Sequence, residues 1–310
     1  MTVEISTQKT YELNLKSNSD TVPIVGESIC DLQASLAQYI VISSVKHMEL
    51  KESVQNKKDD ATILSKAKEL DQYLWHSLEG AMDTVQKYLL KYYENRSKYL
   101  PRITMKAPYQ ENLIVDLYRK DRSPYESFKV EENSAFREIK ENGSYYICNN
   151  IPRDIKDDKY VNKRIDGRFV RSNYKLPGKL LSIWQSISGK PESDISWENC
   201  WDKDNETRPF SGSCYKSTMV VPMTLINASL SREFINYLFG TDEVKNDDKY
   251  KKLMFGFLCI DHRHTDYFNY HNDVRVAYIM ADILSLFLIV RKMYTQNSRA
   301  YGEAKALADK

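Results

Sequence analysis

The sequence lacks a strong net charge, a cysteine framework and a leader segment. Its 45 Lys and Arg residues nearly balance 43 Asp and Glu residues, so the formal net charge is only +2. Such a small charge produces no long-range field that would favour nucleic acid or an anionic membrane as a partner. The five cysteines are odd in number and unclustered, and no cationic and apolar leader precedes them. We therefore expect a cytoplasmic protein without disulfides that binds neither nucleic acid nor membrane.

Long apolar runs are also scarce. The longest, residues 276–290, reads VAYIMADILSLFLIV. It is about five residues short of the roughly 20 that are needed to cross a bilayer, and Asp282 lies near its middle. The run predicts a helix that is buried inside protein.

Motifs of the common enzyme classes are missing as well. The sequence contains no glycine-rich phosphate loop, no Gly-x-Ser-x-Gly elbow and no Cys-x-x-Cys pair. We expect no catalytic residues and no cofactor.

The first ordered segment that the sequence predicts is helical and covers residues 23–100. Residues 1–22 show no sustained apolar period and predict a disordered arm. Apolar residues then recur at three- and four-residue steps from Ser28 to Met48, and again over residues 63–92, with a charged connector between. The second stripe predicts either a helical hairpin within the chain or a coiled coil with a second copy.

After Pro101 the pattern changes to short β-branched and aromatic runs, which predict strands. The runs cover residues 112–120, 144–148, 216–226 and 253–260. A long polar excursion, with a helix predicted over residues 179–187, separates the second strand from the third. A closing helix over about residues 272–295 and a polar tail over residues 298–310 complete the chain.

Three segments carry a resemblance to a known family. They are STMVVPM at Ser217–Met223, GFLCID at Gly256–Asp261, and FNYHNDVRVAYIMADILS at Phe268–Ser285. In this order they resemble the GAF domain family. The resemblance implies an α+β fold over residues 101–297, with an antiparallel sheet flanked by helices and preceded by the N-terminal helical segment. One face of the sheet would take a small molecule under the long excursion, and the first and last helices would cover the other.

The closing helix is apolar on nearly every side, so it must be buried against its sheet and against something else. A second subunit would serve, and members of the family usually dimerise through these helices. The helical pair of the same chain is the alternative. We favour a homodimer.

Ligand contacts are expected in the amide- and arginine-rich excursion and at the start of the third strand. The candidates are Asn149, Asn150, Tyr160, Asn162, Arg164, Arg171 and Ser217. The amides would bind the edge of a heterocycle and the arginines an anionic group. The plainer interpretation is a polar surface loop. The Asn-Lys pair of cyclic-nucleotide-binding relatives is matched by Asn162 and Lys163, but Asp273 lies at the wrong spacing, which disfavours a cyclic nucleotide.

Two other chemistries have weaker signals. Asp261, His262, His264, Asp266 and His271 lie close together, yet no metal-binding motif supports them, and we expect no metal. The cysteines invite comparison with GAF-like reductases of methionine sulfoxide, whose cysteine spacing is not reproduced here. The leading hypothesis is a sensory or regulatory module that binds an unknown small molecule and signals to a separate output protein. The alternatives are a ligand-free assembly protein and a thiol enzyme.

Overall fold

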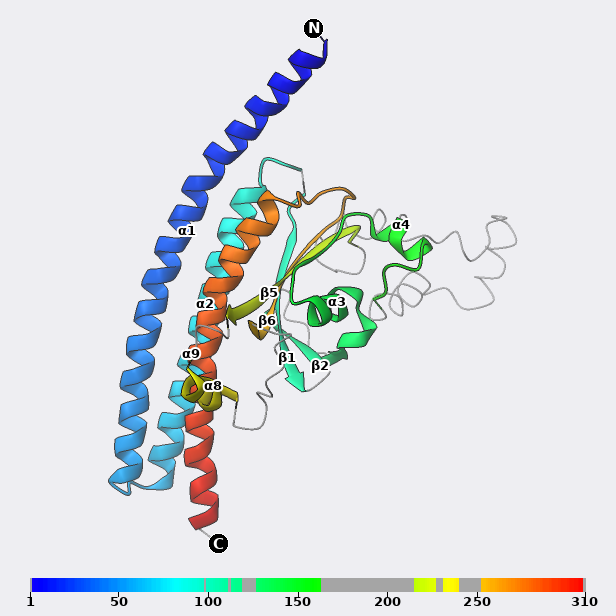
Figure 1. Ribbon diagram of the computed structural model, residues 1–310. Helices are drawn as coiled ribbons and strands as arrows, with labels where there is room; N and C mark the ends of the chain where they lie inside the picture. The colour runs from blue at the N-terminus through cyan, green and yellow to red at the C-terminus, as the bar shows by residue number, and fades with distance from the viewer. Residues whose placement is uncertain are drawn as a thin grey trace, which may run out of the picture. The chain divides into compact units, whose positions relative to one another are not determined.

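The computed structural model describes residues 2–97, 99–110, 113–118, 127–162, 215–226, 231–239 and 252–308. The fold class is α+β, as predicted, with long helices and one antiparallel sheet (Figure 1). The chain forms two compact units. A helical unit comprises residues 1–96, 225–253 and 282–310, and a sheet unit comprises residues 97–224 and 254–281.

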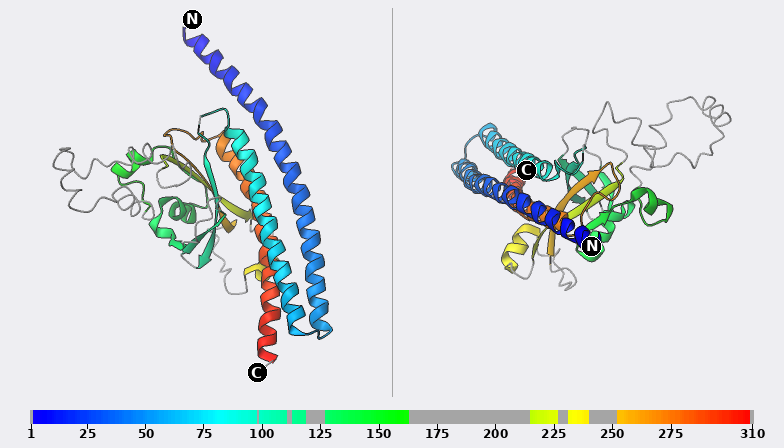
Figure 2. Two further views of the ribbon diagram at one scale, coloured as in Figure 1. Left: turned by 180° about the vertical axis from the view of Figure 1, so that it is seen from behind. Right: turned by 90° about the horizontal axis from the view of Figure 1, so that it is seen from above.

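The helical unit is built on a hairpin of α1 (Thr2–Gln55) and α2 (Asp60–Tyr93). The side chain of Asp59 caps α2 by accepting a hydrogen bond from the backbone N–H of Thr62 at 3.0 Å. The far half of α9 (Asn272–Ala308) lies along the hairpin, as both side views show (Figures 1 and 2). There Phe287 stacks on Tyr39, with ring centroids 5.3 Å apart. The unit also contains α8 (Arg232–Phe239).

The ends of the long helices differ from the sequence prediction. Residues 2–22 belong to α1, so the disordered arm predicted there is wrong, and α1 continues through the charged residues up to Gln55. Likewise α9 continues to Ala308, through most of the predicted polar tail. No apolar stripe marks these three stretches as helix in the sequence, and extending a formed helix needs no new nucleus.

The sheet unit contains six strands in the order β3-β2-β1-β6-β5-β4. Their bounds are β1 Arg102–Gln110, β2 Leu113–Tyr118, β3 Ser127–Lys129, β4 Tyr146–Cys148, β5 Ser217–Ile226 and β6 Lys252–His262. The pairings β1–β2, β1–β6, β2–β3 and β4–β5 are antiparallel. The four predicted strands correspond to β2, β4, β5 and β6, whereas β1 and β3 were not predicted.

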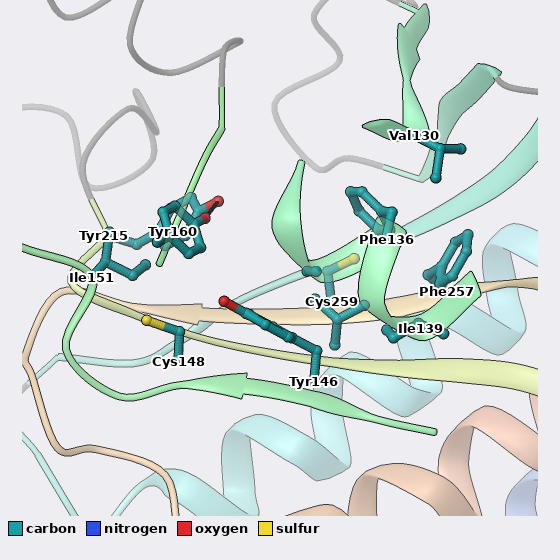
Figure 3. Packing of buried hydrophobic residues seen from close by; sticks show 12 residues of the cluster. Val130, Phe136, Ile139, Tyr146, Cys148, Ile151, Tyr160, Tyr215, Phe257 and Cys259 are labelled. Carbon is teal, nitrogen blue, oxygen red and sulfur yellow. Dashed lines mark hydrogen bonds between the residues drawn. The ribbon is translucent and has the colours of Figure 1, made fainter. Parts of the chain in front are cut away.

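Short helices cover one face of the sheet. After a 3-10 turn, η1 (Val130–Glu132), come α3 (Ser134–Asn142) and α4 (Ile151–Lys156). A buried cluster lies between them and the sheet (Figure 3). We call it the sheet-face cluster; it consists of Val130, Ala135, Phe136, Ile139, Tyr146, Cys148, Ile151, Tyr160, Tyr215, Val220, Phe257 and Cys259.

The apolar run at residues 276–290 lies within α9, where Leu284 and Phe287 are fully buried. Among the helices that the structure describes, none has a stretch long and apolar enough to span a bilayer. The helix predicted over residues 179–187 lies outside the described residues.

Candidate functional site

A buried carboxylate forms the floor of the candidate site. Asp261, near the end of β6, is only 5% exposed. Arg102 of β1 lies opposite it in register and donates from Nη2 and Nε to Oδ2, at 2.7 and 3.2 Å. Thr218 of β5 donates from Oγ1 to the other oxygen at 2.8 Å. Both carboxylate oxygens therefore have donors, which is the condition for burying such a charge.

Beside this floor lies a hydroxyl and amide group, which we call the tyrosine–amide triad. The hydroxyls of Tyr160 and Tyr215 are 3.0 Å apart, and Asn162 donates from Nδ2 to the Tyr215 hydroxyl at 2.9 Å. The two rings lie side by side in Figure 3. Burial raises the pKa of both phenols above the ordinary value of 10, so both are neutral. The Arg102 guanidinium lies 5.7 Å from the Tyr215 ring centroid and joins the triad to the floor.

Local structure explains why the triad assembles. Tyr160 and Asn162 follow α4, and Asn162 forms an isolated antiparallel bridge with Asn133, the residue that caps α3. Tyr215 lies two residues before β5, and Lys216 between them donates from its backbone N–H to the carbonyl of His262 at 2.9 Å. Both sides of the triad are therefore anchored to regular structure.

Thr104 adds a buried hydroxyl to the same face. It pairs in register with Cys259, a member of the sheet-face cluster, and lies two residues after Arg102. Directly paired residues and residues two apart share one face of a sheet. Thr104 is 3% exposed, and its Oγ1 has no hydrogen-bond partner among the described residues. Such an orphaned group is rare in folded proteins and calls for a physical explanation.

The predicted site residues fall into three groups. Tyr160 and Asn162 are brought together in the triad, and Arg164 and Arg171 lie outside the described residues. The other three support loops or helix ends. Asn149 bonds the backbone N–H and carbonyl of Phe268 at 3.0 and 2.8 Å, Ser217 donates to the carbonyl of His264 at 2.8 Å, and Asn150 caps α4.

Sequence reasoning did not assign Arg102, Thr104, Tyr215, Thr218 or Asp261 to this site. One local signal was present: Thr218 is a polar residue near the start of a mostly apolar strand. The remaining members become neighbours only through strand pairing.

Cys148 is a poor candidate nucleophile. Its thiol donates to Asp154 Oδ2 at 3.1 Å, and burial together with this carboxylate raises its pKa to about 12. The group is therefore a thiol at neutral pH, whereas the thiolate is the reactive form. Cys200 and Cys214 lie outside the described residues.

The histidines after β6 are used in packing and in backbone contacts. His262 donates from Nε2 to the carbonyl of Tyr99 at 2.9 Å and accepts at Nδ1 from the backbone N–H of His264 at 3.1 Å. Its ring stacks on Tyr267, with centroids 3.4 Å apart. Burial lowers its pKa from 6.5 to about 4, so it is neutral. Within the part of the chain that the structure describes, no group of three His, Cys, Asp or Glu residues could hold a metal ion.

No protein-family model matches the chain, and no curated protein sequence matches it. The chemistry of the site is therefore inferred from its own residues.

Proposed function

We propose that the chain is a GAF-like regulatory module that binds a small polar molecule on the sheet face bearing the tyrosine–amide triad. Occupancy would be passed to a separate output protein through the helices. The layout supports this proposal, because an antiparallel sheet follows a long helical segment, carries short helices on one face and leads into an apolar closing helix. The three sequence segments that resemble the family lie in β5, in β6 and in the passage into α9.

The triad joins two segments that are far apart in the sequence. Asn162 and Tyr215 are 53 residues apart and are hydrogen-bonded to each other at 2.9 Å. The excursion between them, where the resemblance implies a ligand site, lies outside the described residues.

The observation that carries the proposal is the orphaned hydroxyl of Thr104. A buried donor without a partner costs about 1 to 3 kcal/mol relative to one that is satisfied. A ligand that hydrogen-bonds Oγ1 would remove this cost, so the site favours an occupant that offers an acceptor or a donor at this point. The triad supplies further hydroxyl and amide groups to such a molecule.

The chemistry of these groups narrows the class of ligand. Hydroxyls and an amide bind carbonyl, hydroxyl or ring-nitrogen groups, and the charges of Arg102 and Asp261 are paired with each other. We therefore propose an uncharged polar framework as the part of the ligand that meets the sheet.

An anionic part of the ligand would be bound by Arg164, as predicted from the sequence. Replacing Arg164 with Ala is expected to weaken ligand binding without changing the unfolding temperature, because the sequence predicts a polar loop at this position. Calorimetric titration with the molecule recovered from the purified protein measures the affinity. An unchanged affinity would remove Arg164 from the site.

Native mass spectrometry of the purified full chain tests the function as a whole. We expect a mass above that of the polypeptide, and release of a small molecule on denaturation. Asn162→Ser should lose this extra mass, because it removes the amide of the triad. Asn150→Ser is the matched control: serine also caps helices, so the extra mass should persist.

A ligand-free oligomer in the same experiment would instead favour an assembly protein. Loss of the extra mass from Asn150→Ser together with Asn162→Ser would point to general destabilisation of this region. Either result would count against the proposed site.

A further inference from the structure

Helix α1 has two faces with different character. Leu32, Tyr39 and Leu50 are buried on the face that packs within the helical unit. The opposite face carries a second stripe, which we call the α1 seam. Its residues are alternately three and four positions apart: Glu27, Cys30, Ala34, Ala37, Val41, Ser44, Met48 and Lys51. This alternation is the heptad spacing of helices that pair with another helix.

The seam is exposed where it is most apolar. Val41 is 61% and Met48 is 53% exposed. Ile40 and Val45 flank them and are 45% and 44% exposed. Four large apolar side chains thus gather within nine residues on one side of one helix. Single exposed apolar residues are ordinary, but this contiguous patch lies over a stripe with heptad spacing, which is the arrangement of a helix that pairs with another helix.

The partner helices within the chain are already engaged elsewhere. Tyr39, on the buried face of α1, donates to the carbonyl of Leu74 in α2 at 3.3 Å and stacks on Phe287 of α9. The contacts of Tyr39 therefore place both helices on the buried face of α1, opposite the seam. The homodimer was expected because the apolar closing helix needs a second surface to cover it. Since α2 and α1 already cover α9, a homodimer would have to form through another surface.

We propose that the α1 seam binds the α1 seam of a second copy of the chain, with the two helices antiparallel. In this arrangement Cys30 lies opposite Met48, Ala34 opposite Ser44, and Ala37 opposite Val41. Each layer contains at least one small side chain, which permits close approach of the two backbones. The paired stretch from residue 27 to residue 51 spans roughly 36 Å at 1.5 Å per residue.

Charge complementarity selects the antiparallel direction. Antiparallel pairing places Glu27 at each end of the seam opposite Lys51 of the other copy. Parallel, in-register pairing would place Glu27 opposite Glu27 of the other copy and Lys51 opposite Lys51 of the other copy. Like charges at facing positions are unfavourable. Both residues are exposed and accessible to a partner. The existing ion pair of Glu27 with Lys91, at 3.0 Å, lies on the surface.

The first test is the mass of the full chain in solution, measured by sedimentation velocity over a range of concentrations. The wild type is expected to form a dimer. Val41→Glu should be monomeric with unchanged helical content by circular dichroism. Leu64→Glu is the matched control, because Leu64 is an equally exposed apolar residue, 71% exposed, on α2 and outside the seam. A monomeric wild type, or a dimer that survives Val41→Glu, overturns the proposal.

A charge exchange tests the direction of pairing. Glu27→Lys and Lys51→Glu should each weaken dimerisation by about tenfold or more. The double variant should restore it, because each lysine again meets a glutamate of the other copy. A parallel dimer would gain nothing from the exchange, so failure of the double variant to recover overturns the antiparallel arrangement. The test does not require the ligand to be known, because no residue of the seam belongs to the tyrosine–amide triad.

Discussion

The helical unit and the sheet unit satisfy their buried polar groups in different ways. In the helical unit the buried hydroxyls of Ser28 and Ser53 donate to carbonyls three and four residues back in the same helix, at 2.7 and 2.8 Å. In the sheet unit Arg102 and Asp261 are 159 residues apart in sequence and meet only when β1 pairs with β6. For these serines polar burial is a local matter, whereas for Arg102 and Asp261 it depends on the tertiary fold.

Two buried hydroxyls, one in each unit, show the same contrast. Ser43 on α1 and Thr104 on β1 are both buried, and both have a side-chain oxygen without a hydrogen-bond partner among the described residues. A serine within a helix can bond the carbonyl one turn back by rotating its hydroxyl. A threonine inside a sheet has no such carbonyl, because the ladder uses the neighbouring ones. Of these two hydroxyls, that of Thr104 is therefore the one for which we propose a ligand.

The largest expected effect contrasts a buried and a surface ion pair. Arg102→Met should lower the free energy of unfolding by about 3 to 5 kcal/mol, because the Asp261 carboxylate would lose its counter-charge inside the protein. Lys66→Met in the helical unit breaks the exposed pair with Glu49 and should cost less than about 1 kcal/mol. Urea unfolding measures both changes. Equal effects would show that Asp261 is not buried as a charge.

Acid should affect the sheet unit next most strongly, through His262. Its folded pKa of about 4 lies below the ordinary 6.5, so the unfolded chain binds a proton that the folded chain excludes. The contribution of His262 to stability is complete above pH 6.5 and is lost as the pH falls to about 4. The loss is at most about 3 kcal/mol.

Urea unfolding at several pH values between 7 and 4 measures the slope of the unfolding free energy against pH. His262→Gln should flatten the slope, from a lower starting stability because two hydrogen bonds change. In the helical unit, burial also lowers the pKa of His47, and His47→Gln is expected to change the slope less because this ring is only partly buried. A slope unchanged by His262→Gln would exclude this residue as its cause.

Replacing a glycine with alanine has the smallest expected effect on stability, and the sign of this effect differs between the two units. Gly143 ends α3 with φ of 65°, and Gly80 lies inside α2, while an added Cβ would meet no atom within 4 Å at either position. Conformation alone therefore decides the outcome. Gly143→Ala should destabilise by about 1 kcal/mol and Gly80→Ala should stabilise by about 0.5 to 1 kcal/mol. Thermal unfolding resolves both, and a shift of the same sign in both variants would contradict the assigned backbone conformations.

The same contrast explains what could be predicted from the sequence. The stripe of Leu70, Leu74 and Leu78 gave α2, because helix periodicity is a local signal, and the aromatic and branched runs gave β5 and β6. Strand β1 reads RITMKAPYQ, in which lysine and proline interrupt the apolar pattern, so it was not predicted. The start of α1 was missed because its helix-forming residues carry no apolar stripe.

The candidate site was predictable only in part, for the same reason. Tyr160 and Asn162 lie two residues apart in a segment rich in amides and aromatics, so composition pointed to both. Tyr215 lies 53 residues beyond Asn162, and Thr218 lies 43 residues before Asp261. No pattern in a single sequence specifies the strand registers that bring these residues together.

Thr104→Val tests the central claim most directly, with Thr218→Val as its matched partner on the same sheet face. Valine keeps the shape of threonine and removes only the hydroxyl. Thr218→Val should destabilise the protein by about 1 to 3 kcal/mol, because the buried Asp261 carboxylate loses a donor. Thr104→Val should leave the ligand-free protein equally stable or more stable. It should also abolish binding of the small molecule that native mass spectrometry is expected to detect. A Thr104→Val protein that retains the molecule, or that loses as much stability as Thr218→Val, would contradict the account.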